Sequence, residues 1–168
     1  MSYSQHDWWR QAVVYQIYPK SFQDSGNKGT GDLQGIIQRL DYLQQLGVDA
    51  LWLTPIYSSP QIDNGYDIAD YYAIDPAFGS MADFEQLVSA CKQRGLHIIM
   101  DMVFNHTSTE HVWFKTALRD PQSRFRDFYI WRDPVNGKEP NNWQSKFGGN
   151  AWAFDENSGQ YYLHLFSE

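Results

Sequence analysis

Short apolar segments alternate with amphipathic segments in the first part of the chain, and this order constrains the fold more than any other feature. Residues 13–18, 48–53 and 96–103 are rich in β-branched and aromatic side chains, which is typical of buried strands. Between them, residues 32–47 and 80–95 carry apolar side chains every three or four positions, as in a helix that packs one face on a core. Strands that alternate with helices predict a parallel α/β sheet with right-handed connections.

Both expected helices carry start or stop residues at their ends. One helix is expected to run from Asp32 to a stop at Gly47. The other is expected to start at Ser80, where Asp83 completes a capping box, and to stop at Gly95. The expected apolar stripe of this second helix consists of Phe84, Leu87, Val88 and Cys91. Long connections follow the strands, and such loops at the carboxyl ends of parallel strands are where α/β folds build their sites.

The alternation stops after the third apolar segment. A short helix is expected to start near Ser108, where Thr107 and Glu110 resemble a capping box. Residues 151–154 and 160–166 flank a five-residue polar loop, which predicts a β-hairpin.

Two regions follow from this change of pattern. We expect residues 1–103 to form the β/α part, and residues 104–168 to form a small β-rich domain inserted after the third strand. The first region has 6 Lys+Arg against 12 Asp+Glu, and the second has 7 against 8. The net charge of −7 argues against a nucleic acid as partner.

Three features bear on the location of the protein. The longest apolar stretches fall far short of the roughly 20 residues that span a bilayer. Residues 1–10 lack the basic start and apolar centre of a secretory signal. Cys91 is the single cysteine, so it forms no internal disulfide and suits a reducing compartment. We expect a cytoplasmic protein without a membrane partner.

Aromatic residues make up 17% of the chain, which is more than a core needs. Aromatic rings stack on the C–H faces of sugars while neighbouring amides and carboxylates bind the hydroxyls, so this composition suits a sugar ligand. The alternative is that the rings mainly fill a core and an interface.

The third expected strand ends in a cluster of polar residues. Asp101 closes an otherwise apolar segment, and Asn105 and His106 follow it closely. A carboxylate buried there needs partners, and in an α/β barrel this end of the strand faces the site. We expect a functional role, with a loop-anchoring aspartate and a structural histidine as the alternative.

The loop after the second expected strand contains Asp63, Asn64, Gly65, Tyr66 and Asp67. Two carboxylates flank one aromatic ring, which suits a sugar stacked on Tyr66 and hydrogen-bonded by Asp63. Gly65 permits a tight turn, so an ordinary turn is the alternative interpretation.

Residues 24–32 resemble a calcium loop, in which oxygen ligands alternate along a glycine-rich turn. Gly26 and Lys28 occupy positions where a cation needs oxygens. The ammonium of Lys28 is expected to replace a metal ion by pairing with Asp24 and Asp32. We therefore expect no metal here. Because zinc and nucleotide motifs are also missing from the sequence, we expect no cofactor.

Several motifs resemble the α-amylase family of glycoside hydrolases, in particular its oligo-1,6-glucosidase and trehalose-6-phosphate hydrolase branch. They are residues 9–21 (WRQAVVYQIYPKS), 31–33 (GDL), 47–55 (GVDALWLTP), 64–71 (NGYDIADY), 101–106 (DMVFNH), 128–133 (FYIWRD), 140–152 (PNNWQSKFGGNAW) and 161–166 (YYLHLF). The resemblance implies a (β/α)8 TIM barrel with a small domain inserted after its third strand. The chain would then hold the first three strands and two helices of the barrel.

The same resemblance implies a role for each candidate residue. His106 would reach sugar hydroxyls, and Asp101 would orient its neighbours. Tyr66 would stack on the glucose, Asp63 would bind its hydroxyls, and Phe147 would line the entrance. The catalytic Asp, Glu and Asp of the family would lie beyond residue 168, so none is expected within this chain.

Within the branch, oligo-1,6-glucosidases carry a fuller calcium-like loop, whereas phosphotrehalases often have a degraded one, as Gly26 and Lys28 give here. The resemblance therefore implies trehalose 6-phosphate as the substrate, cleaved with retention to glucose and glucose 6-phosphate. The basic residues Arg124, Arg126, Arg132, Lys138 and Lys146 are a second, weaker indication. An oligo-1,6-glucosidase acting on isomalto- or malto-oligosaccharides remains an alternative, as does a non-catalytic sugar-binding relative. The full-length protein is expected to be a monomer. The isolated chain is expected to be inactive and to lack a stable fold.

Overall fold

The structure, a computed structural model, describes residues 5–166, which form two compact units. One unit contains residues 5–58 and 71–102, and the other contains residues 59–70 and 103–166. The second unit thus includes the described part of the expected insertion together with the loop that carries Asp63 and Tyr66. The boundaries of the inserted domain stay a prediction.

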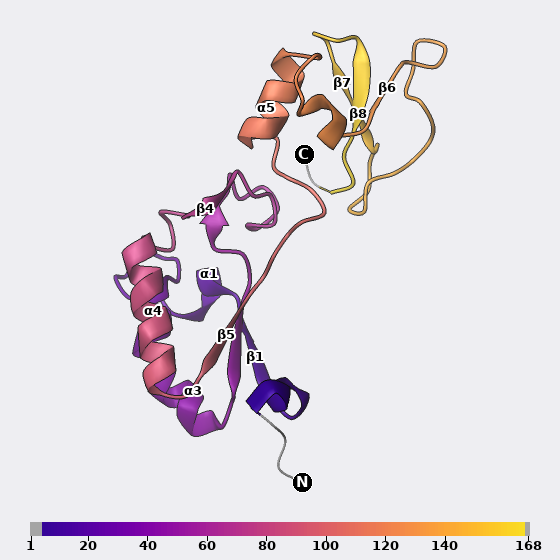
Figure 1. The fold of residues 1–168 in the computed structure, drawn as a ribbon. Helices are drawn as coiled ribbons and strands as arrows, with labels where there is room; N and C mark the ends of the chain where they lie inside the picture. Colours follow the sequence, from indigo (N-terminus) through magenta and orange to yellow (C-terminus); the bar gives the residue numbers. More distant parts are fainter. Residues whose placement is uncertain (1–4, 167–168) are drawn as a thin grey trace. The chain divides into compact units, whose positions relative to one another are not determined.

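The first unit is built on a parallel sheet with the strand order β1–β2–β5 (Figure 1). Its strands are β1 (Val14–Ile17), β2 (Ala50–Leu53) and β5 (His97–Met100). Tyr15 lies opposite Leu51, and Leu51 lies opposite Ile98, so the three strands run in register. The parallel arrangement predicted from the sequence is confirmed.

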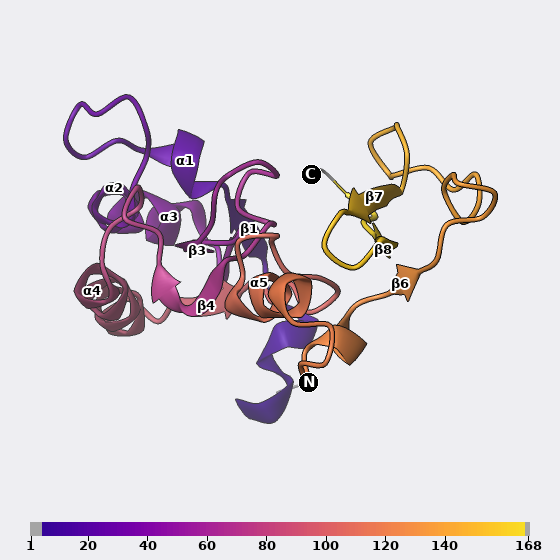
Figure 2. The ribbon, with the colours of Figure 1, turned by 90° about the horizontal axis from the view of Figure 1, so that it is seen from above.

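Helices of the first unit lie on one side of this sheet, as the two views show (Figures 1 and 2). They are α2 (Leu33–Gln38), α3 (Leu40–Leu46) and α4 (Met81–Gln93). The core between helices and strands contains fully buried leucines and isoleucines such as Ile17, Leu40 and Leu87. Shorter elements complete this unit: η1 (Gln5–Arg10), α1 (Pro19–Phe22), and a two-stranded sheet of β3 (Tyr57–Ser58) and β4 (Asp70–Ile74).

The helix predicted from Asp32 to Gly47 is in fact two helices. Asp32 caps α2 by accepting a hydrogen bond from the amide of Gly35 at 2.7 Å, and Gly47 ends α3 with a φ of 84°. The break falls at Arg39 (φ −104°, ψ 3°), whose amide donates to the carbonyl of Ile36 at 3.0 Å. This i→i−3 hydrogen bond, typical of a 3₁₀ turn, tightens the backbone and separates the two helices.

The start of α4 agrees with the sequence. Ser80 and Asp83 form the predicted capping box. Leu87 and Cys91 are buried, but Val88, which was expected in the same stripe, is 41% exposed. The buried stripe is therefore narrower than predicted.

The second unit packs α5 (Val112–Arg119) and η2 (Arg126–Phe128) with an antiparallel sheet. The sheet order is β6–β8–β7, with β6 (Trp131–Arg132), β7 (Trp152–Asp155) and β8 (Gln160–Leu163). The predicted hairpin is confirmed as β7 and β8. A long loop joins β6 to β7 (Figure 2).

The predicted capping box at Thr107 and Glu110 is wrong. The helix α5 starts later, at Val112, and its cap is His111, whose Nδ1 accepts a hydrogen bond from the amide of Trp113 at 3.1 Å. No helix within residues 5–166 is long and apolar enough to cross a membrane.

Candidate functional site

The loop between β3 and β4 makes a tight turn at Asp63 and Tyr66. The amide of Tyr66 donates to the carbonyl of Asp63 at 3.0 Å, and the two central residues, Asn64 and Gly65, have φ values of 52° and 97°. Positive φ at both central positions is the pattern of a type I′ turn, for which Asn-Gly is a preferred pair. The turn places the side chains of Asp63 and Tyr66 at one cavity.

Asp67 stabilises this loop from the inside. Its Oδ1 accepts from the hydroxyl of Ser59 and its Oδ2 accepts from the amide of Ile62, both at 2.8 Å. The residue is buried and does not line the cavity. Of the two carboxylates that flank Tyr66 in the sequence, only Asp63 is therefore placed to contact a ligand.

His106 connects the turn to the segment that follows β5. Its Nε2 lies 3.0 Å from the backbone carbonyl oxygen of Tyr66, and its Nδ1 lies 3.2 Å from the side-chain amide nitrogen, Nδ2, of Asn105. Because a carbonyl oxygen only accepts, Nε2 carries the hydrogen and Nδ1 accepts from Asn105. The orientation of the ring is thus set by hydrogen bonds on both nitrogens.

Two phenylalanine rings from later in the chain, in the same unit, also line the cavity. The ring centroid of Phe166 lies 4.7 Å from that of His106 and 6.0 Å from that of Phe147. The cavity has a volume of about 360 Å³. It is lined by Asp63, Asn64, Tyr66, His106, Phe147 and Phe166.

The structure brings four of the five predicted binding residues to this cavity, and it adds Asn64 and Phe166. The sequence did not single out Phe166, because the residue follows the end of the hairpin and only the fold brings it to His106. The YYLHLF motif that ends at Phe166 was the one available signal.

Asp63 supplies the carboxyl group among the residues that line the cavity. Partial burial, together with the negative charge of Asp67, raises the pKa of the Asp63 carboxyl, and the imidazole of His106 partly opposes this. An ionised carboxylate accepts hydrogen bonds only, which is the role that a sugar hydroxyl needs from its partner.

Asp101, the fifth predicted residue, belongs to the first unit. There its Oδ2 accepts a hydrogen bond from the indole nitrogen of Trp52 at 3.3 Å. Burial, with a smaller contribution from the charge of Asp101, raises the pKa of Tyr57. The hydroxyl of Tyr57 lies 3.0 Å from the sulfur of Met102.

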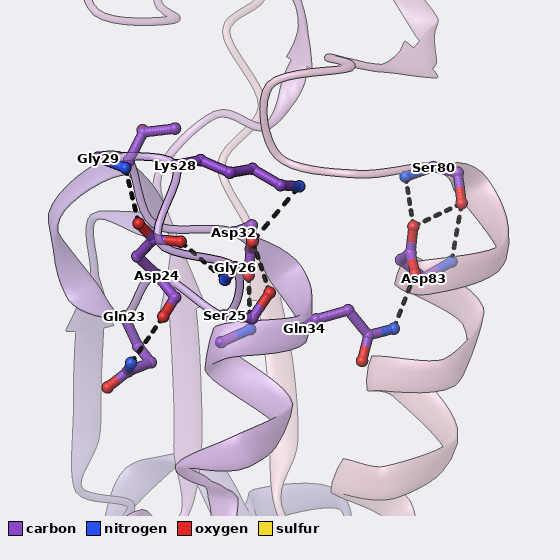
Figure 3. Close-up of polar contacts among 12 residues, drawn as sticks. Gln23, Asp24, Ser25, Gly26, Lys28, Gly29, Asp32, Gln34, Ser80 and Asp83 are labelled. Atoms are coloured by element: carbon purple, nitrogen blue, oxygen red, sulfur yellow. Dashed lines mark hydrogen bonds and ion pairs between the residues drawn. The ribbon is translucent and has the colours of Figure 1, made fainter.

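Residues 24–32 form a loop held by its own groups (Figure 3). The carboxylate of Asp24 accepts from the amides of Gly26 and Gly29 at 2.9 and 2.7 Å, and these bonds, the one from Gly26 above all, lower its pKa. The ammonium of Lys28 lies 4.0 Å from Oδ2 of Asp32. The prediction that Lys28 pairs with both Asp24 and Asp32 is therefore only half right. Within residues 5–166, its ion pair is with Asp32.

This donor set does not fit a divalent cation. The carboxylate oxygens of Asp24 face backbone amides, and a lysine ammonium stands where a further oxygen ligand is needed. The helix α2, which follows the loop, is connected to α4, because the side-chain amide of Gln34 donates to the carboxylate of Asp83 at 2.7 Å (Figure 3).

The cavity and the parallel sheet can be compared with known proteins. Residues 16–168 match the family model described as alpha amylase, catalytic domain. The chain is 62% identical over 160 residues to trehalose-6-phosphate hydrolase of Escherichia coli (strain K12), covering 95% of this chain and 29% of that protein. It is 58% identical over 161 residues to an oligo-1,6-glucosidase of Halalkalibacterium halodurans, covering 96% of this chain and 29% of that protein.

A solved structure gives the same result for the fold. An isomaltulose synthase variant from Erwinia rhapontici NX5, in complex with D-glucose, matches with a TM-score of 0.94 at 52% identity, covering 96% of this chain and 29% of that chain. Our chain thus spans about 29% of the length of these relatives. Since the family model covers all but the first 15 residues, the chain belongs to the family of alpha-amylase catalytic domains.

Proposed function

We propose that the full-length enzyme containing this chain hydrolyses trehalose 6-phosphate to glucose and glucose 6-phosphate. The observation that carries this proposal is the cavity in which a carboxylate, an imidazole and three aromatic rings converge. Its volume of about 360 Å³ lies within the usual range for small-molecule sites. Rings beside hydrogen-bonding groups suit a glucose unit, because the sugar presents C–H faces and hydroxyls.

Each predicted residue has a proposed role in holding the non-phosphorylated glucose. The carboxylate of Asp63 accepts hydrogen bonds from hydroxyls, and Tyr66 stacks on the ring. His106, in the segment that follows β5, contacts the hydroxyls of the sugar, and Phe147 lines the entrance of the cavity. Asp101, which follows β5, orients its own neighbours in the first unit.

The proposed reaction retains the configuration of the glucose. It requires a nucleophilic carboxylate and an acid/base carboxyl about 5 Å apart, which perform a double displacement. We propose that these residues come from the part of the enzyme outside this chain. The chain alone then supplies substrate contacts but no catalysis.

The substrate is tested by comparing kcat/KM of the full-length enzyme for trehalose 6-phosphate, trehalose and isomaltose. We expect trehalose 6-phosphate to be preferred by at least tenfold. Efficient cleavage of isomaltose with poor cleavage of trehalose 6-phosphate would instead establish the oligo-1,6-glucosidase alternative, which the similarity to such enzymes supports. Sugar binding without any turnover would identify a non-catalytic sugar-binding relative.

We further propose that the 168-residue chain does not form a stable independent module. Within residues 5–166, the parallel sheet ends at β1 and β5, and large apolar side chains on these strands are open to solvent, including Val14 (46%) and Ile99 (37%). Such edges and faces favour aggregation. A soluble monomer with a sharp thermal transition would contradict this proposal, and turnover of an aryl α-glucoside would contradict its lack of activity.

The proposed location is the cytoplasm, and the proposed oligomeric state of the full-length enzyme is a monomer. Cys91, the single cysteine, supports the location, because it forms no internal disulfide and suits a reducing compartment. Cell fractionation and size-exclusion chromatography test the two statements.

A further inference from the structure

Most basic side chains of the second unit already have a partner. Arg126 and Lys115 form ion pairs, Arg119 and Arg132 donate to backbone carbonyls, and Arg124 lies over the ring of Phe125. Two lysines remain, Lys138 and Lys146. Both are exposed, and within the described chain neither ammonium takes part in an ion pair or a side-chain hydrogen bond.

The backbone of Lys146 is held directly before Phe147, a residue that lines the cavity. Its amide donates to the carbonyl of Leu165 at 2.8 Å. The preceding residue, Ser145, is buried and its hydroxyl contacts the carbonyls of Leu165 and Phe166 at 3.3 and 3.1 Å. The following residue, Phe147, lines the cavity together with Phe166. The backbone of Lys146 therefore has a defined place between Ser145, which is bonded to residues 165 and 166, and Phe147, which lines the cavity.

Lys138 occupies a different position. Its backbone exchanges two hydrogen bonds with Val135 at 3.0 and 3.1 Å, around a turn whose central residues, Asn136 and Gly137, have positive φ. None of these four residues lines the cavity, and none is next in sequence to a residue that does. Lys138 is thus a matched control for Lys146, with the same charge and exposure in the same unit.

A phosphorylated substrate needs a cation at this place. A sugar phosphate carries a charge of about −1.5 to −2 at pH 7. Asp63 at the cavity, Asp67 behind it and the net charge of −7 all repel such an anion. A lysine ammonium is a compact point charge that binds phosphate well.

We infer that Lys146 binds the phosphate of the leaving glucose 6-phosphate and so determines the preference for phosphorylated over neutral substrates. This inference rests on the proposed function. It assigns the two halves of the substrate to different residues: the cavity at Asp63 and His106 holds the neutral glucose, and Lys146, the neighbour of Phe147, holds the charged half.

The test uses the full-length enzyme with the variants Lys146→Ala, Lys146→Arg and Lys138→Ala. The substrates are trehalose 6-phosphate and a neutral aryl α-glucoside, which lacks the phosphate. We expect Lys146→Ala to lower kcat/KM for trehalose 6-phosphate about 10- to 100-fold more than for the aryl glucoside, as expected for one hydrogen bond to a charged group. The loss is expected mainly in KM and should shrink as salt rises, since salt screens an exposed charge. Lys146→Arg is expected to keep most of the preference, and Lys138→Ala to keep all of it.

The outcomes separate this inference from the proposed function. If the wild-type enzyme shows no preference for trehalose 6-phosphate, the proposed function fails. If the wild type has the preference and Lys146→Ala retains it, only the inference about Lys146 fails. An equal loss on both substrates would also overturn the inference, because it would indicate damage to the cavity.

Discussion

The imidazole Nε2 of His106 donates a hydrogen bond to the backbone carbonyl of Tyr66 over 3.0 Å, across 40 positions of sequence. One side chain therefore both lines the cavity and secures the turn that presents Asp63 and Tyr66. Any substitution at His106 acts on ligand contacts and on the shape of this turn together.

We expect His106→Ala in the full-length enzyme to lower kcat/KM about 10²-fold, because the turn that presents Asp63 and Tyr66 loses its anchor and small misplacements of binding groups are costly. The loss of the hydrogen bond to Tyr66 should reduce the free energy of unfolding by only about 1 kcal/mol. Kinetics with an aryl α-glucoside and a thermal melt measure the two effects. A wild-type rate, or an unfolded variant, would remove His106 from the proposed site.

Arg126 is the central side chain of the second unit. Its guanidinium lies 3.6 Å from the Asp155 carboxylate, donates to the carbonyl of Ala117 at 2.9 Å, and stacks over the ring of Trp131 at 3.3 Å. Arg126 and Asp155 are both buried. Replacing Arg126 with Ala leaves a buried carboxylate unpaired, so we expect a loss of about 3–5 kcal/mol in the free energy of unfolding.

Urea denaturation of the full-length protein, followed by tryptophan fluorescence, measures this loss. The exposed Arg132→Ala variant is the control and should change stability by less than about 0.5 kcal/mol. Equal stability of the two variants would contradict the central role of Arg126.

His111 should make the second unit sensitive to acid. Its Nδ1 caps α5 by accepting from the amide of Trp113, and burial lowers its pKa below the ordinary value of 6.5, with Asp70 partly opposing. The folded state thus binds the proton less readily than the unfolded chain. The contribution of His111 is complete above about pH 7 and declines as the pH falls through 6.5.

The His111→Asn variant keeps a capping acceptor but does not titrate. We expect the melting temperature of the wild type to fall relative to that of His111→Asn between pH 7.5 and 5.5. A constant difference between the two melting temperatures across this range would show that His111 does not respond to pH.

The loop of residues 24–32 should be indifferent to metal ions. We expect neither a chelator nor added Ca²⁺ to shift the melting temperature of the full-length protein, because backbone amides and Lys28 already satisfy Asp24 and Asp32. Lys28→Ala should cost less than about 1 kcal/mol, since the side chain of Lys28 is 65% exposed. Tight Ca²⁺ binding in a titration calorimeter would refute this prediction.

Local signals in the sequence predicted much of the first unit. Ser80 with Asp83 and the left-handed Gly47 lie where the pattern placed them, because caps and stops act over only a few residues. His111 was missed as a cap, since histidine is not among the preferred capping residues. The break at Arg39 carries no proline or glycine, so nothing in the local pattern marked it.

The candidate site was predictable only in part, because local patterns do not encode contacts between residues that are far apart in the sequence. Asp63, Tyr66 and His106 lie in loops after apolar strands, where sites are expected. Phe166 reaches the cavity through long-range packing, which no local pattern encodes. Asp63 and not Asp67 was predicted as the sugar-binding carboxylate, and the loop geometry supplies the physical reason, because it turns Asp67 inward to Ser59.

The cavity joins residues that are far apart along the chain, from Asp63 to Phe166. At ribosomal rates of about 5–20 residues per second, Phe166 is synthesised about 5–20 s after Asp63. During that time the turn at Asp63 and Tyr66 lacks its contacts with the segment up to Phe166, which has not yet been synthesised. During translation this loop is therefore an exposed, unfinished surface, and we expect chaperones to bind the nascent enzyme within this interval.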